Sequence, residues 1–149
     1  MKKFCIFTLL ISAVLLTNLY AEGQKFGLGV IAGEPTGITA KMYLSENDAV
    51  DAAASWSFVK DRIHLHADYI RHFPGVIDRE FDDFVLYAGV GGLVELDDES
   101  EFGARIPVGV NYYFNSVPVE LFLEIGPALL LIPETRFEFT GGIGARYYF

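Results

Sequence analysis

The sequence predicts an all-β protein, an eight-stranded antiparallel up-and-down transmembrane β-barrel. Three observations predict it: eight segments alternate apolar and polar residues, the amino-terminal stretch has the composition of an export signal, and the last residue is an aromatic one, Phe149. Side chains at alternate positions of a strand lie on opposite faces of the sheet. A closed ring of such strands leaves no unpaired edge in lipid.

Residues 1–21 predict a secretory signal peptide. Two lysines precede a mostly apolar run from Ile6 to Leu16, and a small residue, Ala21, stands at a suitable cleavage site. The apolar run is shorter than the roughly 20 residues that a membrane-spanning helix needs, so a retained anchor is the weaker alternative. We therefore expect export through the secretory pathway and an outer-membrane barrel domain over residues 22–149.

Composition restricts the partners. The 149 residues are 52% hydrophobic and carry a net charge of −9, which predicts one domain without the basic surface that nucleic acid requires. The one cysteine, Cys5, lies in the predicted signal peptide. The exported chain would then contain neither disulfides nor thiolate metal ligands.

The first four strands are expected within residues 25–32, 38–44, 50–58 and 63–73. In each of them, apolar side chains occupy one face and glycine, polar or charged side chains occupy the other. Turn residues such as the GEPTG sequence at 33–37 separate them. This period of two predicts strands with one apolar and one polar face.

The last four strands are expected within residues 86–95, 104–114, 119–131 and 136–149. The final segment shows the pattern most clearly. Its apolar positions include Phe137, Ile143 and Phe149, whereas its charged residues all fall on the opposite face.

The polar face is expected to line the barrel interior. It is rich in glycine and carries charges of both signs, which suits a narrow polar lumen, whereas a soluble barrel would turn its apolar face inward. Aromatic residues gather toward the ends of the apolar face, as in the girdles at two membrane interfaces. These are Trp56 and Phe58 at one level and Tyr112, Phe114, Tyr147 and Phe149 at the other. The predicted interior charge network comprises Lys25, Lys41, Asp51, Asp68, Glu95, Arg105, Glu120, Glu124, Glu138 and Arg146.

The last nine residues, GGIGARYYF, resemble the carboxy-terminal strand of outer-membrane barrels. That resemblance implies recognition by the barrel-assembly machinery through Ile143, Ala145, Tyr147 and Phe149, and a final location in outer-membrane lipid. The size and strand count resemble those of OmpX and of the OmpA membrane domain. The sequences GEPTGITAKMYL, LHADYIRHF, RIPVGVNYYF and GARYYF resemble a little-characterised family of short barrels in spirochaetes and other diderm bacteria. No activity comes with either resemblance.

His64, His66 and Asp68 form a weak candidate for a metal site, because they share one face of a predicted strand. Alternate side chains on one strand supply only part of a metal shell. We therefore expect these residues to join a hydrogen-bonded interior network, with no bound metal or cofactor.

No catalytic residue is expected, and the protein is not predicted to be an enzyme. Glu120 and Glu124 would lie roughly 13 Å apart on an extended strand, farther than the carboxylate pairs of glycosidases. We expect them to pair with basic residues of neighbouring strands. A turn centred on Glu134 would make Arg146 the diagonal neighbour of Glu124.

The expected function is that of a structural or surface-interaction protein with a plugged, charged interior. One alternative is a narrow pore for water, ions or a small solute, and another is an adhesin that binds host or envelope partners. The outer connections at 33–37, 60–61 and 133–134 are too short to form a large interface. The acidic residues Asp97, Asp98, Glu99 and Glu101 are the candidate surface contact for an extracellular ligand that the sequence does not identify.

Overall fold

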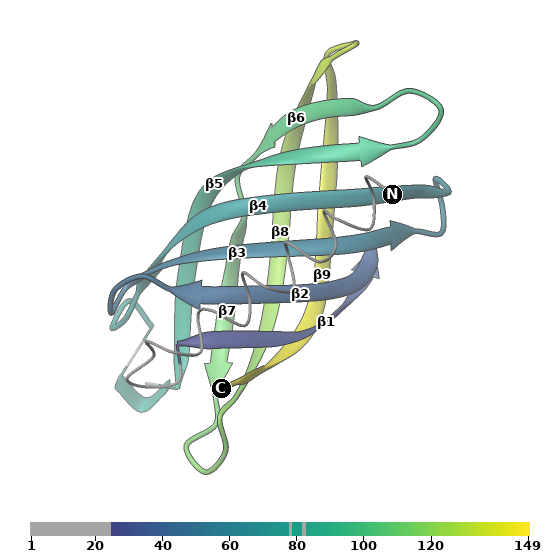
Figure 1. Cartoon of the computed structure of the whole chain (residues 1–149). Coiled ribbons are helices and arrows are strands. Elements are labelled where there is room, and N and C mark those ends of the chain that lie inside the picture. The colour runs from purple at the N-terminus through teal and green to yellow at the C-terminus, as the bar shows by residue number, and fades with distance from the viewer. Residues whose placement is uncertain (1–24, 78, 82) are drawn as a thin grey trace.

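The structure is a computed structural model that describes residues 25–77, 79–81 and 83–149. The predicted signal peptide, residues 1–21, lies outside the described residues. The described chain forms a β-sheet that closes into a barrel (Figure 1). Its strands are β1 (Phe26–Glu34), β2 (Thr36–Tyr43), β3 (Asp48–Ser57), β4 (Arg62–Phe73), β5 (Phe84–Leu96), β6 (Glu101–Arg105), β7 (Val108–Tyr113), β8 (Val119–Ile132) and β9 (Arg136–Tyr148).

The ring has eight strand positions, because β6 and β7 are two parts of one interrupted strand. Both pair with β5 on one side and with β8 on the other. Pro107 interrupts the ladder because proline has no N–H to donate, although the neighbouring Ile106 N–H still donates to the Pro127 carbonyl at 2.9 Å. The remaining neighbours pair antiparallel, and β1 pairs with β9 to close the ring. The predicted eight-stranded antiparallel barrel is confirmed.

The connections alternate between two ends of the barrel. At the terminal end, β1 begins and β9 ends, and the Phe149 N–H donates to the Phe26 carbonyl at 2.8 Å. This end also carries the connections 44–47, 74–83 and 114–118; the second of these contains the 3-10 helix η1 (Arg79–Phe81). At the opposite, distal end lie Pro35 and the connections 58–61, 97–100 and 133–135. Among the described residues, no helix is long and apolar enough to cross a membrane.

The polarity of the two faces is inverted relative to that of a soluble barrel. Outward side chains at mid-strand are apolar and exposed, including Val30 at 59% and Leu123 at 54% of their accessible surface. Inward side chains include Lys41 and Arg105, each at 1%, and Glu120 at 0%. The predicted assignment of inside and outside is therefore confirmed for these strands.

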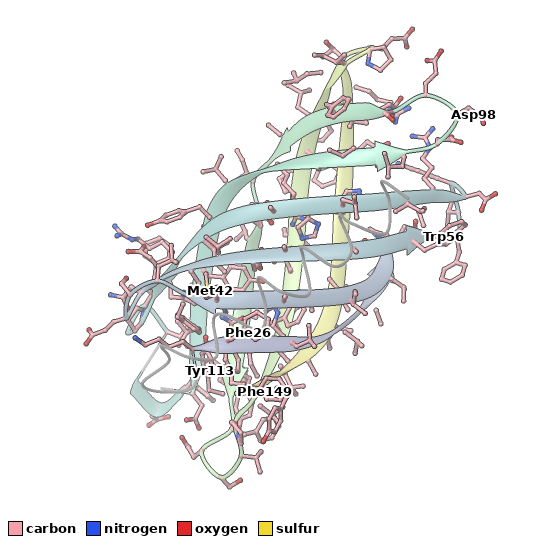
Figure 2. All side chains as sticks on the ribbon, viewed as in Figure 1. Phe26, Met42, Trp56, Asp98, Tyr113 and Phe149 are labelled. Carbon is pink, nitrogen blue, oxygen red and sulfur yellow. The ribbon has the colours of Figure 1, made fainter. Side chains whose placement is uncertain are left out.

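Aromatic side chains gather on the outer surface near both ends. Trp56 and Phe149 lie toward opposite ends of the barrel (Figure 2). Near the distal end, the rings of Phe137 and Phe139 pack edge to face with their centroids 4.8 Å apart. At the terminal end, the rings of Tyr147 and Phe149 are 5.0 Å apart. These positions are those expected of interfacial girdles.

One inward apolar ring, Phe122 of β8, depends on a glycine of the next strand. A Cβ atom added to Gly144 would lie 2.3 Å from the Phe122 ring and 2.4 Å from the Val30 carbonyl oxygen. Glycine at this place lets the ring fill the lumen beneath the Arg146 guanidinium, whose Cζ is 3.9 Å from the ring centroid.

Candidate functional site

The interior is held together by three clusters of polar side chains, and Glu120 of β8 is the centre of the first. Its carboxylate accepts hydrogen bonds from Lys41 Nζ at 3.0 Å, Arg146 Nη1 at 2.7 Å and the Tyr148 hydroxyl at 2.7 Å. Glu120 stands directly opposite Arg146 in the β8–β9 register. Two buried cations therefore share one carboxylate.

Arg146 also connects strands that are not neighbours. Its Nη2 donates to the Thr39 hydroxyl of β2 at 2.9 Å and to Asp51 Oδ2 of β3 at 3.3 Å. Because β9 pairs with β1 and β8, these bonds cross the lumen instead of running along the wall. The guanidinium thus links β9 with β8, β2 and β3 across the lumen.

The second cluster surrounds Glu124, farther along β8. Glu124 accepts hydrogen bonds from Arg105 Nη2 at 2.5 Å and from the Tyr87 hydroxyl at 2.6 Å. Arg105 Nε lies 3.5 Å from Asp68 Oδ2, which makes an ion pair without a hydrogen bond. These side chains are all buried.

The third cluster covers the distal mouth. Arg62 Nη1 donates to Glu95 at 2.7 Å and to Glu101 at 3.0 Å, and Arg136 Nη2 donates to Glu101 at 2.6 Å. Arg136 is also 3.0 Å from Glu138, which pairs with Lys60. Ion pairs between strands from several parts of the ring thus bridge this mouth.

Tyrosines occupy the terminal mouth. The Tyr43 and Tyr113 hydroxyls are hydrogen-bonded to each other, and Asn111 Nδ2 donates to the Tyr113 hydroxyl at 3.0 Å. Lys41 Nζ lies 5.0 Å from the centroid of the Tyr43 ring, a cation–π distance. Alternation of inward and outward positions places these tyrosines on the inward face. The predicted interior network omits them because it considers charged residues alone.

Lys25 does not belong to the interior network. Its position has inward parity, but it precedes the first residue of β1 and is exposed at the terminal end. The other nine residues of the predicted network are inward-facing. The prediction for Lys25 was wrong because parity gives the face of a residue and not its depth along the barrel.

The predicted Glu124–Arg146 pair was also wrong. Gly142 stands opposite Glu124, and Glu120 stands opposite Arg146. The β8–β9 turn is centred on Pro133, one residue earlier than expected, which shifts every cross-strand partner by two residues. Arg105 replaces Arg146 as the partner of Glu124.

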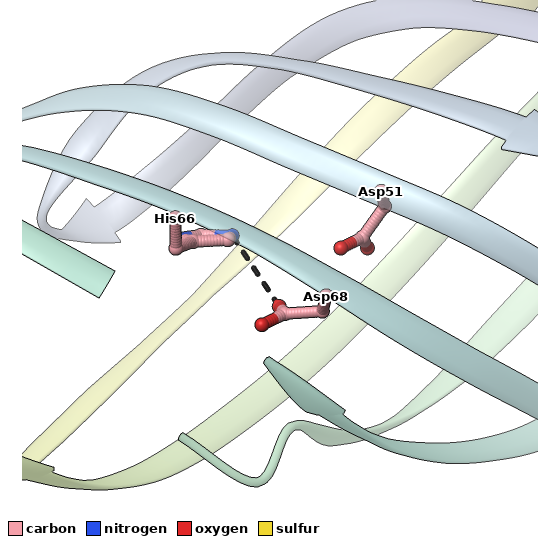
Figure 3. Close-up of side chains that lie close together, drawn as sticks. All are labelled: Asp51, His66 and Asp68. Atoms are coloured by element: carbon pink, nitrogen blue, oxygen red, sulfur yellow. Dashed lines mark ion pairs between the residues drawn. The ribbon is translucent and has the colours of Figure 1, made fainter. Parts of the chain in front are cut away.

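The three residues of the weak metal candidate separate into two groups. His64 Nδ1 lies 3.5 Å from Glu95 Oε1 and belongs to the distal cluster. His66 Nε2 lies 3.7 Å from Asp68 Oδ2, and Asp51 stands opposite Asp68 on β3. Figure 3 shows Asp51, His66 and Asp68 pointing toward one another. Pattern analysis of single strands missed Asp51 because its proximity depends on the β3–β4 register.

The acidic surface residues differ in their surroundings. Asp97 lies 3.3 Å from Arg62, and Glu101 pairs with Arg62 and Arg136, so these two carboxylates are part of the distal cluster. Asp98 and Glu99 are exposed at the tip of the connection. Arg62 and Arg136 occupy inward positions in the alternation of their strands, so the sequence pattern could have included them in the interior network.

The residues of the predicted assembly signal lie on β9 and just beyond it. Ile143, Tyr147 and Phe149 face outward with 59%, 48% and 58% of their surface exposed, and Ala145 is half-buried. Their side chains therefore form a continuous apolar edge on the outside of the strand.

Two small cavities lie in the distal half of the lumen. One has a volume of about 40 Å³ and is bordered by residues that include Ser57, His64 and Glu95. The other has a volume of about 10 Å³ and is bordered by residues that include Ser55, His66 and Glu124. The smaller volume is near the lower limit of the space that one water molecule needs.

Comparison with known proteins identifies the fold alone. No protein family and no curated protein sequence matches the chain. The crystal structure of the N-terminal β-barrel domain of OprF from Pseudomonas aeruginosa is similar, with a TM-score of 0.64 and 17% sequence identity. The match covers 85% of this chain and 98% of the OprF chain. The described chain therefore has the fold of a small β-barrel like the OprF domain.

Proposed function

We propose that this protein is a small outer-membrane β-barrel with a plugged interior, which acts as a structural or surface-interaction protein. The observation that carries the proposal is the inverted polarity of the barrel. Exposed apolar side chains surround the wall, whereas arginine, lysine and carboxylate side chains are buried inside it. Such a surface is stable in lipid and costly in water.

The proposed orientation places the terminal end in the periplasm and the distal end outside the cell. The predicted export signal, the aromatic belts and the carboxy-terminal assembly signature support this arrangement. The exposed carboxylates of Asp98 and Glu99 would then be available to an extracellular partner. The proposal assigns no catalytic residue and no enzymatic activity.

A plugged interior is supported by the density of ion pairs across the lumen. Arg146 spans from β9 to β2 and β3, and the distal cluster bridges the mouth. The cavities beside His64 and His66 are too small for a continuous hydrated path. Eight-stranded barrels usually have just enough interior space for side chains.

Single-channel recording tests the plug against the alternative of a narrow pore. We expect the refolded chain to give no steady conductance in planar bilayers, with folding of the same sample verified by heat-modifiable migration in gels. Steady wild-type conductance would instead favour the transport function. The refolded OprF barrel domain serves as a comparison with a similar fold.

Deleting Phe149 should lower the amount of folded, heat-modifiable protein in the outer membrane. The deletion removes the exposed terminal aromatic that is proposed to be read by the assembly machinery. Quantitative immunoblotting of outer-membrane fractions measures this effect. Phe149→Tyr, which retains the ring, is the matched control and should assemble normally. Wild-type levels of the deletion variant would contradict the proposed signal.

A further inference from the structure

A further polar site lies in the lumen between β3 and β4, where the first and second clusters meet. Asp51 and Asp68 stand directly opposite each other in the β3–β4 register, and His66 precedes Asp68 by two residues on the same face. Each of the three residues offers one ligand atom, and these atoms all lie within 4.8 Å of one another. Both aspartates are 2% exposed, and the His66 side chain is 8% exposed.

The site contains polar atoms that the rest of the interior leaves unsatisfied. Asp51 Oδ1, both carboxylate oxygens of Asp68 and His66 Nδ1 are buried without a hydrogen-bond partner in the described part of the chain. Asp68 has Arg105 Nε as an ion-pair partner at 3.5 Å, but Arg105 directs its hydrogen bond to Glu124 instead. Buried polar atoms without partners are rare in native proteins and call for an explanation.

The charges of the interior point to a missing cation. Within the described part of the lumen, the ion pairs join three basic side chains with four carboxylates, an excess of one negative charge. Lys41 and Arg146 share Glu120, and Arg105 pairs most closely with Glu124. The two aspartates of the site are therefore the carboxylates with the weakest compensation in the lumen.

We propose that Asp51, His66 and Asp68 bind one divalent transition-metal ion of the zinc class inside the barrel. Two carboxylates and one imidazole form a ligand set that suits Zn²⁺, which commonly takes three protein ligands and one water. Ca²⁺ needs six to eight oxygen ligands, and Mg²⁺ rarely takes imidazole. A divalent cation would also compensate the negative charge of the two aspartates.

A glycine and a small cavity border the site. Gly91 stands opposite Asp68 on β5, and a Cβ atom there would lie 1.9 Å from Asp68 Oδ1. The glycine therefore leaves room for this carboxylate oxygen beside β5. The cavity of about 10 Å³ beside His66 has space near that of one water ligand. Ligand atoms must approach to roughly 2.0–2.2 Å from Zn²⁺, so the three side chains must move closer together than they are without the ion.

Zinc titration of the folded, chelator-stripped chain in detergent micelles tests the proposal. With a competing fluorescent chelator, we expect one Zn²⁺ to bind per chain. Each single substitution of a ligand, namely Asp51→Asn, His66→Gln or Asp68→Asn, should weaken Zn²⁺ binding by about tenfold or more. Loss of a residue that only supports a ligand typically weakens metal binding by about 10–100-fold, and loss of a ligand should weaken it at least as much. Zn²⁺ should raise the urea midpoint of the wild type, and Co²⁺ should give the intense visible absorption of a four-coordinate site.

His64→Gln is the matched control, because His64 lies on the same face of β4 but contacts Glu95. It should bind Zn²⁺ like the wild type. If an aspartate variant does not fold, His66→Gln decides the question because it keeps both aspartates and introduces no charge. The proposal is overturned by a wild-type chain without stoichiometric Zn²⁺ binding, or by site variants that retain wild-type affinity. These readouts do not depend on whether the barrel conducts.

Discussion

Glu120→Gln is expected to lower the free energy of unfolding by about 3–5 kcal/mol, the usual cost of removing one partner from a buried ion pair. The substitution leaves Lys41 and Arg146 buried beside a neutral amide. Urea titration in detergent micelles measures the effect, with fluorescence from Trp56, the single tryptophan of the sequence. An unchanged midpoint would contradict a network centred on Glu120.

A double variant separates charge from packing in the same cluster. Lys41→Met combined with Glu120→Gln removes one cation together with its carboxylate, and Arg146 retains Asp51 at 3.3 Å. We expect the double variant to be more stable than Glu120→Gln alone, because one uncompensated charge is gone. Asp98→Asn, at an exposed position, is the surface control and should leave the midpoint unchanged.

Leu123→Arg is expected to destabilise the lipid-embedded barrel by about 2–4 kcal/mol, the cost of a cation near the bilayer midplane. Leu123 faces outward near the middle of β8, with 54% of its surface exposed. Urea unfolding in phospholipid vesicles measures the effect. If the outer wall contacted water instead of lipid, the substitution should not lower the free energy of unfolding by this amount.

Leu131→Arg is the matched control for depth. Leu131 lies on the same outward face of β8, next to its last residue, and is 49% exposed. Near the interface, the same substitution should cost only about 0–1 kcal/mol. Equal costs at Leu123 and Leu131 would contradict the proposed position of the wall in the bilayer.

The period of two predicts the fold and the direction of the side chains because both are local properties of a strand. Once β8 is extended, Glu120 and Glu124 share a face that excludes Leu123. The same reasoning places Lys41 and Arg105 inside the barrel. Alternation also marks Tyr148 as inward, whereas its hydrogen bond to Glu120 depends on the β8–β9 register.

Side-chain partners depend on register and on contacts across the ring, which a single strand does not encode. A one-residue difference in the centre of the β8–β9 turn assigns Arg146 to Glu120 instead of Glu124. The approach of Arg146 to Asp51 requires closure of the ring, because β9 and β3 are not neighbours. The residues of the metal candidate differ from those expected for the same reason, because only the β3–β4 register places Asp51 opposite Asp68.

Collision rates at a nitroxide on Val90→Cys test the central claim most directly, namely that the outer wall contacts lipid. Val90 lies near the middle of β5, away from the termini and the ion pairs, and is 61% exposed. The chain is prepared without residues 1–21, so that it lacks Cys5, and is reconstituted in vesicles. Electron paramagnetic resonance then measures how often the nitroxide collides with oxygen, which concentrates in lipid, and with a nickel chelate, which stays in water. The account predicts frequent oxygen collisions and few nickel collisions. Frequent nickel collisions with few oxygen collisions would contradict it.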